Sequence, residues 1–337
     1  MAPRLPRSDT PSCNPLMDPS TEAILMSKSR SPLRAAAGLL AGTSSFLLLA
    51  ACAQHAPSAD VHADHAGQVA ASPASASRAS STDASLPAGS ADVAQRLASS
   101  PRHGEYVMIP TGPGDSVRAW VVYPERSTKA PVVVVVHEIF GLSTWIRGVA
   151  DQLAADGYIA IAPDLLTGKA ARAAGSDTLT QAAATSAIRT LQPGDVQRQL
   201  TAVGKYGMSL PAAEHSYGIV GFCWGGGTSF AHAVVSPEGL GGAVVYYGTS
   251  PALSSLSSVR VPVLGLYAGD DARVGATVPP ADSAMRAMGK PFDVHSFAGA
   301  GHGFLRQQDG KEGANMKAAQ QAWPETIQFI RKNTAGQ

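Results

Sequence analysis

The feature that most constrains the fold is the stretch Gly-Phe-Cys-Trp-Gly-Gly at residues 221–226. The residues before it, 217–220, are mostly β-branched or aromatic, which predicts a short buried strand. The residues after it, 225–235, contain no proline and are rich in alanine and valine, which predicts a helix. The chain must therefore turn from strand to helix within one or two residues. The flanking glycines are needed there, because a Cβ would collide with the neighbouring strand and helix.

Cys223 occupies the tip of this predicted turn. A residue in that place has a strained backbone, a side chain at the carboxyl edge of the sheet and a helix N-terminus beneath it. This is the geometry of the G-x-S-x-G nucleophile elbow, with cysteine in place of serine. The helix N-terminus would favour thiolate over thiol. The alternative is a small buried apolar residue, since free cysteine is often buried; the glycine frame and the partners described below favour a nucleophile.

Residues 1–52 have the parts of an export signal. A positively charged stretch at 26–34 is followed by an apolar stretch at 35–49 and then by Leu-Ala-Ala-Cys, ending at Cys52. The apolar stretch is too short, and too rich in alanine and glycine, for a membrane span. Leu-Ala-Ala-Cys resembles a bacterial lipobox, so we expect Cys52 to carry lipid, with an uncleaved apolar anchor as the alternative. Met26 is the expected initiator.

Residues 53–101 are rich in alanine, serine, proline, histidine and aspartate and have almost no large apolar side chain. Such a segment cannot bury enough surface to offset its ordering entropy, so it predicts a flexible tether. Its scattered histidines, His55, His62 and His65, are not expected to bind metal. The folded domain is expected at 102–337.

The cysteine count argues against a structural disulfide, and the net charge argues against nucleic acid binding. The chain has three cysteines, Cys13, Cys52 and Cys223, and a net charge of +1. If Cys13 precedes the true start and Cys52 carries lipid, Cys223 has no disulfide partner in an exported protein. No basic run interrupts the folded part, so nothing indicates nucleic acid binding.

Predicted strands and helices alternate through the rest of the chain. An opening antiparallel pair at 106–110 and 117–123 precedes a central strand at 131–136, whose β-branched run is typical of a strand covered on both faces. The alternation predicts an α/β fold with a mostly parallel sheet flanked by helices and with ligands at the carboxyl ends of the strands. The remaining strands are expected at 158–162, 217–222, 241–247, 261–267 and 292–297. The helices are expected at 143–155, 177–207 with a break at Pro193-Gly194, 225–235, 281–288 and 316–332.

Three further groups at predicted strand ends suit catalysis with Cys223. Asp270 and Asp271 follow the strand at 261–267, and His302 lies in a glycine-rich loop after the last strand. This chain order of nucleophile, acid and histidine is that of an α/β-hydrolase triad, with Asp271 favoured over Asp270 as the acid. Glu138 directly follows the central strand; a solvated loop carboxylate is the alternative there.

Four strings together resemble the dienelactone hydrolase family, which is carboxymethylenebutenolidase-like. They are Val-His-Glu-Ile-Phe-Gly-Leu, Gly-Phe-Cys-Trp-Gly-Gly, Gly-Asp-Asp-Ala-Arg-Val and Gly-His-Gly-Phe, in that order. The intervals of 48 residues from Cys223 to Asp271 and of 31 from Asp271 to His302 also resemble those of the family. The resemblance spans nearly the whole folded region and implies the α/β-hydrolase fold.

The resemblance implies a role for each matched residue. Cys223 is the nucleophile, Asp271 and His302 complete the triad, and Glu138 modulates the thiol. The backbone N–H groups of Ile139 and Trp224 are implied as the oxyanion hole.

The resemblance also implies a contact for the substrate carboxylate. Arg306 matches an arginine that holds this group in the lactone-cleaving members of the family. A second substrate-binding arginine has no confident counterpart; Arg172 and Arg189 are nearby candidates only.

The sequence therefore predicts a lipid-anchored hydrolase without cofactor that cleaves an ester or lactone through an acyl-thiol intermediate. We expect a monomer on the periplasmic side of the outer membrane, bound to the membrane through the anchor alone. Metal is not expected, because His137, His232 and His302 lack ligand-like spacing. Two alternatives are a broader carboxylesterase or thioesterase on the same triad and a non-catalytic envelope lipoprotein that retains the fold as a binding module.

Overall fold

A computed structural model describes residues 83–169 and 175–334. The export signal, Met26, Cys52 and most of the predicted tether lie outside these residues, as does Arg172. Within the described residues, no helix has both the length and the apolar character needed to cross a membrane.

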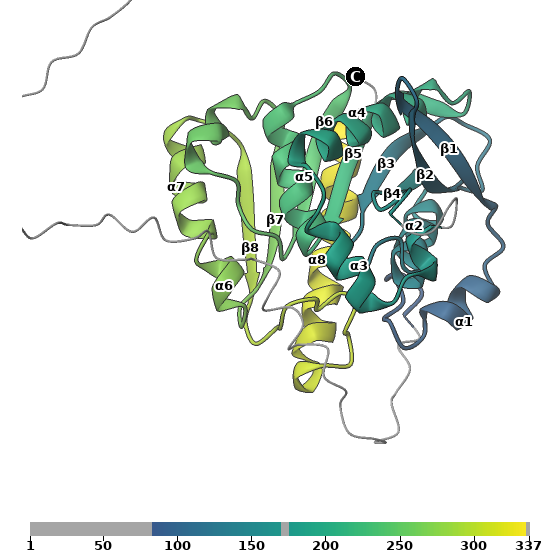
Figure 1. Ribbon diagram of the computed structural model, residues 1–337. Helices are drawn as coiled ribbons and strands as arrows, with labels where there is room; N and C mark the ends of the chain where they lie inside the picture. The colour runs from purple at the N-terminus through teal and green to yellow at the C-terminus, as the bar shows by residue number, and fades with distance from the viewer. Residues whose placement is uncertain (1–82, 170–174, 335–337) are drawn as a thin grey trace, which may run out of the picture. The chain divides into compact units, whose positions relative to one another are not determined.

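The core of the domain is one eight-stranded sheet with the order β1-β2-β4-β3-β5-β6-β7-β8 (Figure 1). Strand β2 is antiparallel to both β1 and β4. The other neighbouring pairs, which join β4, β3, β5, β6, β7 and β8 in that order, are all parallel. This confirms the opening antiparallel pair and the mostly parallel sheet. The strands are β1 Gly104–Gly112, β2 Asp115–Val122, β3 Ala130–Val136, β4 Ile159–Asp164, β5 Ala213–Phe222, β6 Leu240–Tyr246, β7 Val263–Ala268 and β8 Phe292–Phe297.

Helices cover both faces of this sheet (Figure 1). Helices α1, α2 and α8 contribute to one buried apolar cluster, and α4, α5 and α7 contribute to the other. The helices are α1 Val93–Ala98, α2 Thr144–Ala155, α3 Gln181–Ile188, α4 Pro193–Ser209, α5 Trp224–Val235, α6 Ala272–Gly275, α7 Val278–Ala287 and α8 Ala314–Thr334. The predicted helical region 177–207 contains two helices, and the break predicted at Pro193-Gly194 is confirmed: Pro193 begins α4, at a position where a missing N–H costs nothing.

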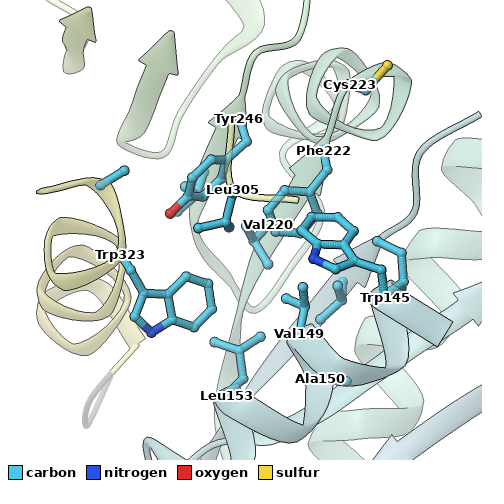
Figure 2. Close-up of a cluster of buried hydrophobic side chains, with 14 of the residues drawn as sticks. Trp145, Val149, Ala150, Leu153, Val220, Phe222, Cys223, Tyr246, Leu305 and Trp323 are labelled. Atoms are coloured by element: carbon cyan, nitrogen blue, oxygen red, sulfur yellow. The ribbon is translucent and has the colours of Figure 1, made fainter. Parts of the chain in front are cut away.

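Strand β3 demonstrates how the sequence builds two buried layers. All of its residues are buried, and they alternate between the two clusters: Val133 and Val135 join one, whereas Val132 and Val134 join the other. A strand buried on both faces needs a continuous apolar run, which the valines of 132–136 supply. In Figure 2 the layer against α2 and α8 contains the large side chains Trp145, Phe222, Tyr246 and Trp323.

The folded domain begins earlier than the predicted boundary at residue 102. Within 83–101, Leu86 and Val93 are buried, and α1 packs against α2. The Gln308 side chain donates a hydrogen bond of 2.7 Å to the carbonyl oxygen of Pro87. The prediction of a flexible tether is therefore wrong for residues 83–101, because these few apolar side chains find partners far away in the sequence.

Candidate active site

The turn between β5 and α5 has the strained geometry that the glycine frame predicts. Cys223 has φ 58° and ψ −117°, in a region that side chains rarely adopt. A Cβ on Gly221 would overlap the carbonyl oxygen of Gly225, and a Cβ on Gly225 would overlap the carbonyl oxygens of Val136 and His137. The glycines therefore allow the strand and helix to approach closely, which holds the cysteine at the sheet edge. Figure 2 shows its sulfur pointing away from the apolar cluster.

Asp271 and His302 lie side by side in loops that follow β7 and β8. The Asp271 Oδ2 and the His302 Nδ1 are 2.5 Å apart, and the other oxygen of Asp271 accepts a bond from the N–H of Val274 at the start of α6. Both side chains are nearly buried, with exposed fractions of 10% for His302 and 7% for Asp271. Asp270 instead is half exposed and pairs with Lys311 at 3.2 Å. The structure thus places Asp271, and not Asp270, against the histidine.

His302 links this carboxylate to Cys223. Burial lowers the pKa of His302, but its hydrogen bonds with Asp271 and with Cys223 outweigh burial and raise the pKa to about 9. Burial also opposes ionisation of Asp271, yet the hydrogen bond and the charge of His302 keep its pKa below the ordinary value. The imidazole of His302 therefore carries its proton at neutral pH, beside the sulfur of Cys223.

Glu138 follows β3 and is buried in an ion pair with Arg306. The Glu138 Oε2 lies 3.0 Å from the Arg306 Nε, and the exposed fractions of the side chains are 3% and 20%. The guanidinium carbon of Arg306 also lies 5.3 Å from the ring centre of Phe140. In this state the carboxylate of Glu138 is held by Arg306, and the two residues are 168 positions apart in the sequence.

His137 fixes the loop that carries Glu138 and Ile139. Its Nδ1 lies 2.7 Å from the carbonyl oxygen of Glu138, and its Nε2 accepts a bond of 3.2 Å from the N–H of Leu165. Burial lowers the pKa of this histidine, which keeps it neutral with the proton on Nδ1. The sequence predicted only that His137 does not bind metal; its position directly after a buried strand was the available signal for this structural role.

The two expected oxyanion-hole residues, Ile139 and Trp224, follow the ends of β3 and β5. Trp224 is the first residue of α5, so its N–H has no partner within the helix. Ile139 follows the loop residue that His137 fixes, and the rings of His137 and Trp224 stack with centres 5.6 Å apart. Both N–H groups thus belong to backbone that is held in place.

A cleft of about 240 Å³ opens beside Cys223. Its apolar wall comes from Leu191, Pro193 and Val196 of α4 and the loop before it. Arg273, two residues after Asp271, is the cation among the lining residues, which also include Gln197, Thr228, Tyr247, Thr249 and Ser250. Within the described residues, no group of three or more histidine, cysteine or acidic side chains could hold a metal ion.

Arg189 and Arg273 differ in their relation to this cleft. Arg189 is exposed at the end of α3 and does not line the cleft, whereas Arg273 does. Arg273 was not among the candidates from the sequence, Arg172 and Arg189, which both precede the elbow. Its position in α6, two residues after Asp271, was the available signal.

The eight-stranded sheet, the helices on both faces and the strained residue between β5 and α5 define an α/β-hydrolase fold. The chain belongs to the dienelactone hydrolase family, whose family model matches residues 117–334. Membership of this family makes it a hydrolase that acts on esters or lactones.

Curated relatives and solved structures agree with this assignment. A Saccharolobus solfataricus protein provisionally named a carboxymethylenebutenolidase is 29% identical over 256 residues, covering 65% of this chain and 95% of that protein. The carboxymethylenebutenolidase of Pseudomonas putida is 29% identical over 208 residues, which is 60% of this chain and 86% of that one. A Klebsiella pneumoniae crystal structure, provisionally described as a dienelactone hydrolase, matches with TM-score 0.60 and 25% identity over 68% of this chain and 99% of that one.

Proposed function

We propose that this chain cleaves an ester or a lactone with Cys223 as the nucleophile, through an acyl-thioester intermediate. The observation that carries the proposal is the continuous series of contacts from Cys223 through His302 to Asp271 beside an open cleft. A sulfur on a strained turn, a histidine and a buried carboxylate in this order form a complete nucleophilic triad.

In the first half-reaction, the Cys223 sulfur attacks the carbonyl carbon and the carbonyl oxygen becomes an oxyanion. The N–H groups of Ile139 and Trp224 are the donors for this oxyanion, and such a donor contributes about 3 kcal/mol to the transition state. The C–O bond then breaks, and the departing alkoxide takes the proton of the His302 imidazolium. The product of this step is a thioester on Cys223.

In the second half-reaction, neutral His302 takes a proton from water, and the resulting hydroxide attacks the thioester carbon. The thiolate leaves, and the carboxylic acid product dissociates. Asp271 holds the imidazole in one orientation and stabilises the imidazolium in both half-reactions. A lactone gives a single product, because its alkoxide and acid belong to one molecule.

Two arginines are positioned to recognise an anionic substrate. Arg273 lines the cleft, and Arg306 pairs with Glu138 in the loop after β3. A substrate carboxylate that attracted Arg306 would free the carboxylate of Glu138, which could then act on the thiol as the family resemblance implies. A guanidinium suits this task because it binds a carboxylate through two parallel hydrogen bonds.

Substitution of the nucleophile tests the proposal. Cys223→Ala should abolish turnover of small activated esters while the thermal melting temperature stays close to that of the wild type. Asp270→Asn is the matched control, because Asp270 is exposed and bonded to Lys311, and it should retain activity. Undiminished turnover in Cys223→Ala would refute the proposal.

A broader carboxylesterase or thioesterase activity on the same triad is the second candidate. The apolar wall formed by Leu191, Pro193 and Val196 favours it, since this wall suits an uncharged acyl chain. A panel of neutral and anionic esters separates the two. Loss of the preference for anionic substrates in Arg306→Ala supports the narrower function, and no preference in the wild type supports the broader one.

We also propose export and lipid attachment at Cys52, on the basis of the sequence alone. Mass spectrometry of the mature N-terminus tests this. A diacylglyceryl modification at Cys52 is the expected result, and a mature chain that retains residues before Cys52 would contradict it.

A further inference from the structure

Tyr247 has an unusual backbone conformation for an aromatic residue. It directly follows strand β6 and has φ 39°, in the left-handed region that glycine usually occupies. Holding a bulky residue there costs on the order of 1–3 kcal/mol, and such strain gathers at functional sites. Cys223 is the other strained residue beside this cleft, and both residues line it.

The ring of Tyr247 is fixed against the catalytic histidine. The side chain is fully buried, and its ring centre lies 5.1 Å from that of His302 at an interplanar angle of 60°. Phe304 also packs edge-on against this ring, with ring centres 5.2 Å apart. The ring therefore has one orientation, and the hydroxyl has one location.

The hydroxyl of Tyr247 has no hydrogen-bond partner among the described residues, although it is buried. A buried polar group without a partner is costly and usually has a functional explanation. The preceding residue provides the contrast: the Tyr246 hydroxyl, equally buried, lies 2.7 Å from the Thr326 hydroxyl.

The surroundings of the Tyr247 hydroxyl keep it protonated. Burial raises its pKa well above the ordinary value, and the charges of Glu138, Arg306 and Cys223 also reach it. The phenol is therefore protonated at any pH at which the enzyme works. Tyr247 lines the cleft together with Cys223, and its ring contacts His302, so it lies beside both groups that would act on the scissile bond.

We propose that the Tyr247 hydroxyl donates a hydrogen bond to an oxygen of the bound ester or lactone, and so is a substrate-binding residue of this hydrolase. The proposal rests on the function proposed above. It explains why the chain retains two costs at one position, the strained backbone and the unpaired hydroxyl. A substrate oxygen in the cleft would give the hydroxyl its hydrogen-bond partner, and the strained backbone holds the hydroxyl in place for it.

Two phenylalanine substitutions on neighbouring residues test this proposal. Tyr247→Phe should lower kcat/KM for activated esters about 10- to 100-fold, as expected for the loss of one buried hydrogen bond to the reacting group. Its melting temperature should stay the same or rise, because an unpaired buried hydroxyl is removed. Tyr246→Phe should do the reverse: activity within about twofold of the wild type, and a melting temperature lower by about 2–4 °C.

Alkylation by iodoacetamide without substrate distinguishes a contact to substrate from an effect on the thiol. Tyr247→Phe should leave the alkylation rate of Cys223 unchanged. A slower rate would mean that the hydroxyl acts through the thiol, which would overturn the proposal.

Other outcomes are equally decisive. Tyr247→Phe within twofold of wild-type kcat/KM overturns the proposal, as does an equal loss of activity in Tyr246→Phe. If Cys223→Ala is inactive while Tyr247→Phe is fully active, this inference fails alone. If Cys223→Ala keeps wild-type turnover, the proposed function fails, and this inference fails with it.

Discussion

The carboxyl edge of the sheet and the apolar layer between the sheet and helices α2 and α8 differ in what they hold. The edge contains two strained non-glycine residues, Cys223 and Tyr247, and the buried charged groups of Glu138 and Asp271. The layer is mostly apolar, and many of its side chains, such as Leu153, come from regular helices and strands. Phe222 links the two, since it packs in the layer and immediately precedes the strained cysteine.

The layer therefore supplies most of the stability of the fold, and the edge holds the reacting groups. Strain and buried charge at the edge cost free energy, and the packed layer beneath offsets that cost. Substitutions at the edge should therefore change the reaction and leave folding largely intact, whereas substitutions in the layer should change folding and leave the reaction of the folded molecules intact.

The largest expected effect is at the nucleophile. Cys223→Ser should lower kcat by a factor on the order of 10⁴ or more, because a hydroxyl is much harder to deprotonate than a thiol and the site is arranged for a thiolate. The melting temperature should remain within a few degrees of the wild type, since the two side chains are similar in size. A serine variant with nearly full activity would contradict the requirement for a thiolate at this position.

The next effect concerns the carboxylate behind His302. Asp271→Asn should lower kcat/KM by a factor on the order of 10³, because the imidazolium loses its neighbouring charge. In the wild type, kcat/KM should fall as pH rises through about 9, where the imidazolium loses its proton. In Asp271→Asn that fall should move to lower pH, because the first of the two hydrogen bonds that raise the pKa of His302 loses its charged partner.

The same proton links pH to folding. Because the pKa of His302 is raised from 6.5 to about 9, this group contributes stability that is fully present below about pH 6.5 and is lost as pH rises through about 9. Thermal melting across this pH range tests the link between this proton and stability, and a melting temperature that stays constant through pH 9 would contradict it. A pH profile of kcat/KM that is identical in Asp271→Asn and the wild type would contradict the role of Asp271 in raising the pKa of His302.

A third effect belongs to the layer. Leu153→Ala should lower the free energy of unfolding by about 2–5 kcal/mol, since the side chain is fully buried and leaves a cavity. Below the melting temperature, kcat per folded molecule should stay within about twofold of the wild type, because the catalytic groups do not touch Leu153. Chemical denaturation and active-site titration measure both quantities. A large loss of kcat with no change in the free energy of unfolding would contradict this separation of stability from chemistry.

The smallest effect is at the rim of the cleft. Arg273→Gln should raise KM for an anionic ester about tenfold, with little change for a neutral ester of the same size, because one charged hydrogen-bonding contact is lost. Arg189→Gln is the matched control, since Arg189 is exposed and does not line the cleft. Equal effects of Arg273→Gln on neutral and anionic esters would contradict a role in charge recognition.

Much of the fold follows from local sequence. The alternation of strands and helices and the β3 run could be predicted because each depends on the residues within its own segment. The elbow could be predicted because its glycine pattern lies within one short segment. The atoms that require Gly225, however, belong to Val136 and His137, which are distant in the sequence. The bond between Asp271 and His302 was expected from chain order and family resemblance, not from any distance in the sequence.

Other features could not be predicted because they depend on distant partners. Residues 83–101 fold because Leu86 and Val93 reach buried sites, and few apolar residues marked that segment. The pairing of Glu138 with Arg306 joins residues 168 positions apart. The positive φ of Tyr247 was also missed, since a tyrosine at the end of a β-rich run predicts extended backbone.

The most direct measurement of the central proposal is the intact-protein mass after brief incubation with an activated ester. We expect a single acyl adduct that forms within one turnover, maps to Cys223, decays as product appears, and is absent in Cys223→Ala. Full turnover with no adduct at any time, or an adduct that maps to another residue, would contradict a mechanism through a thioester on this cysteine.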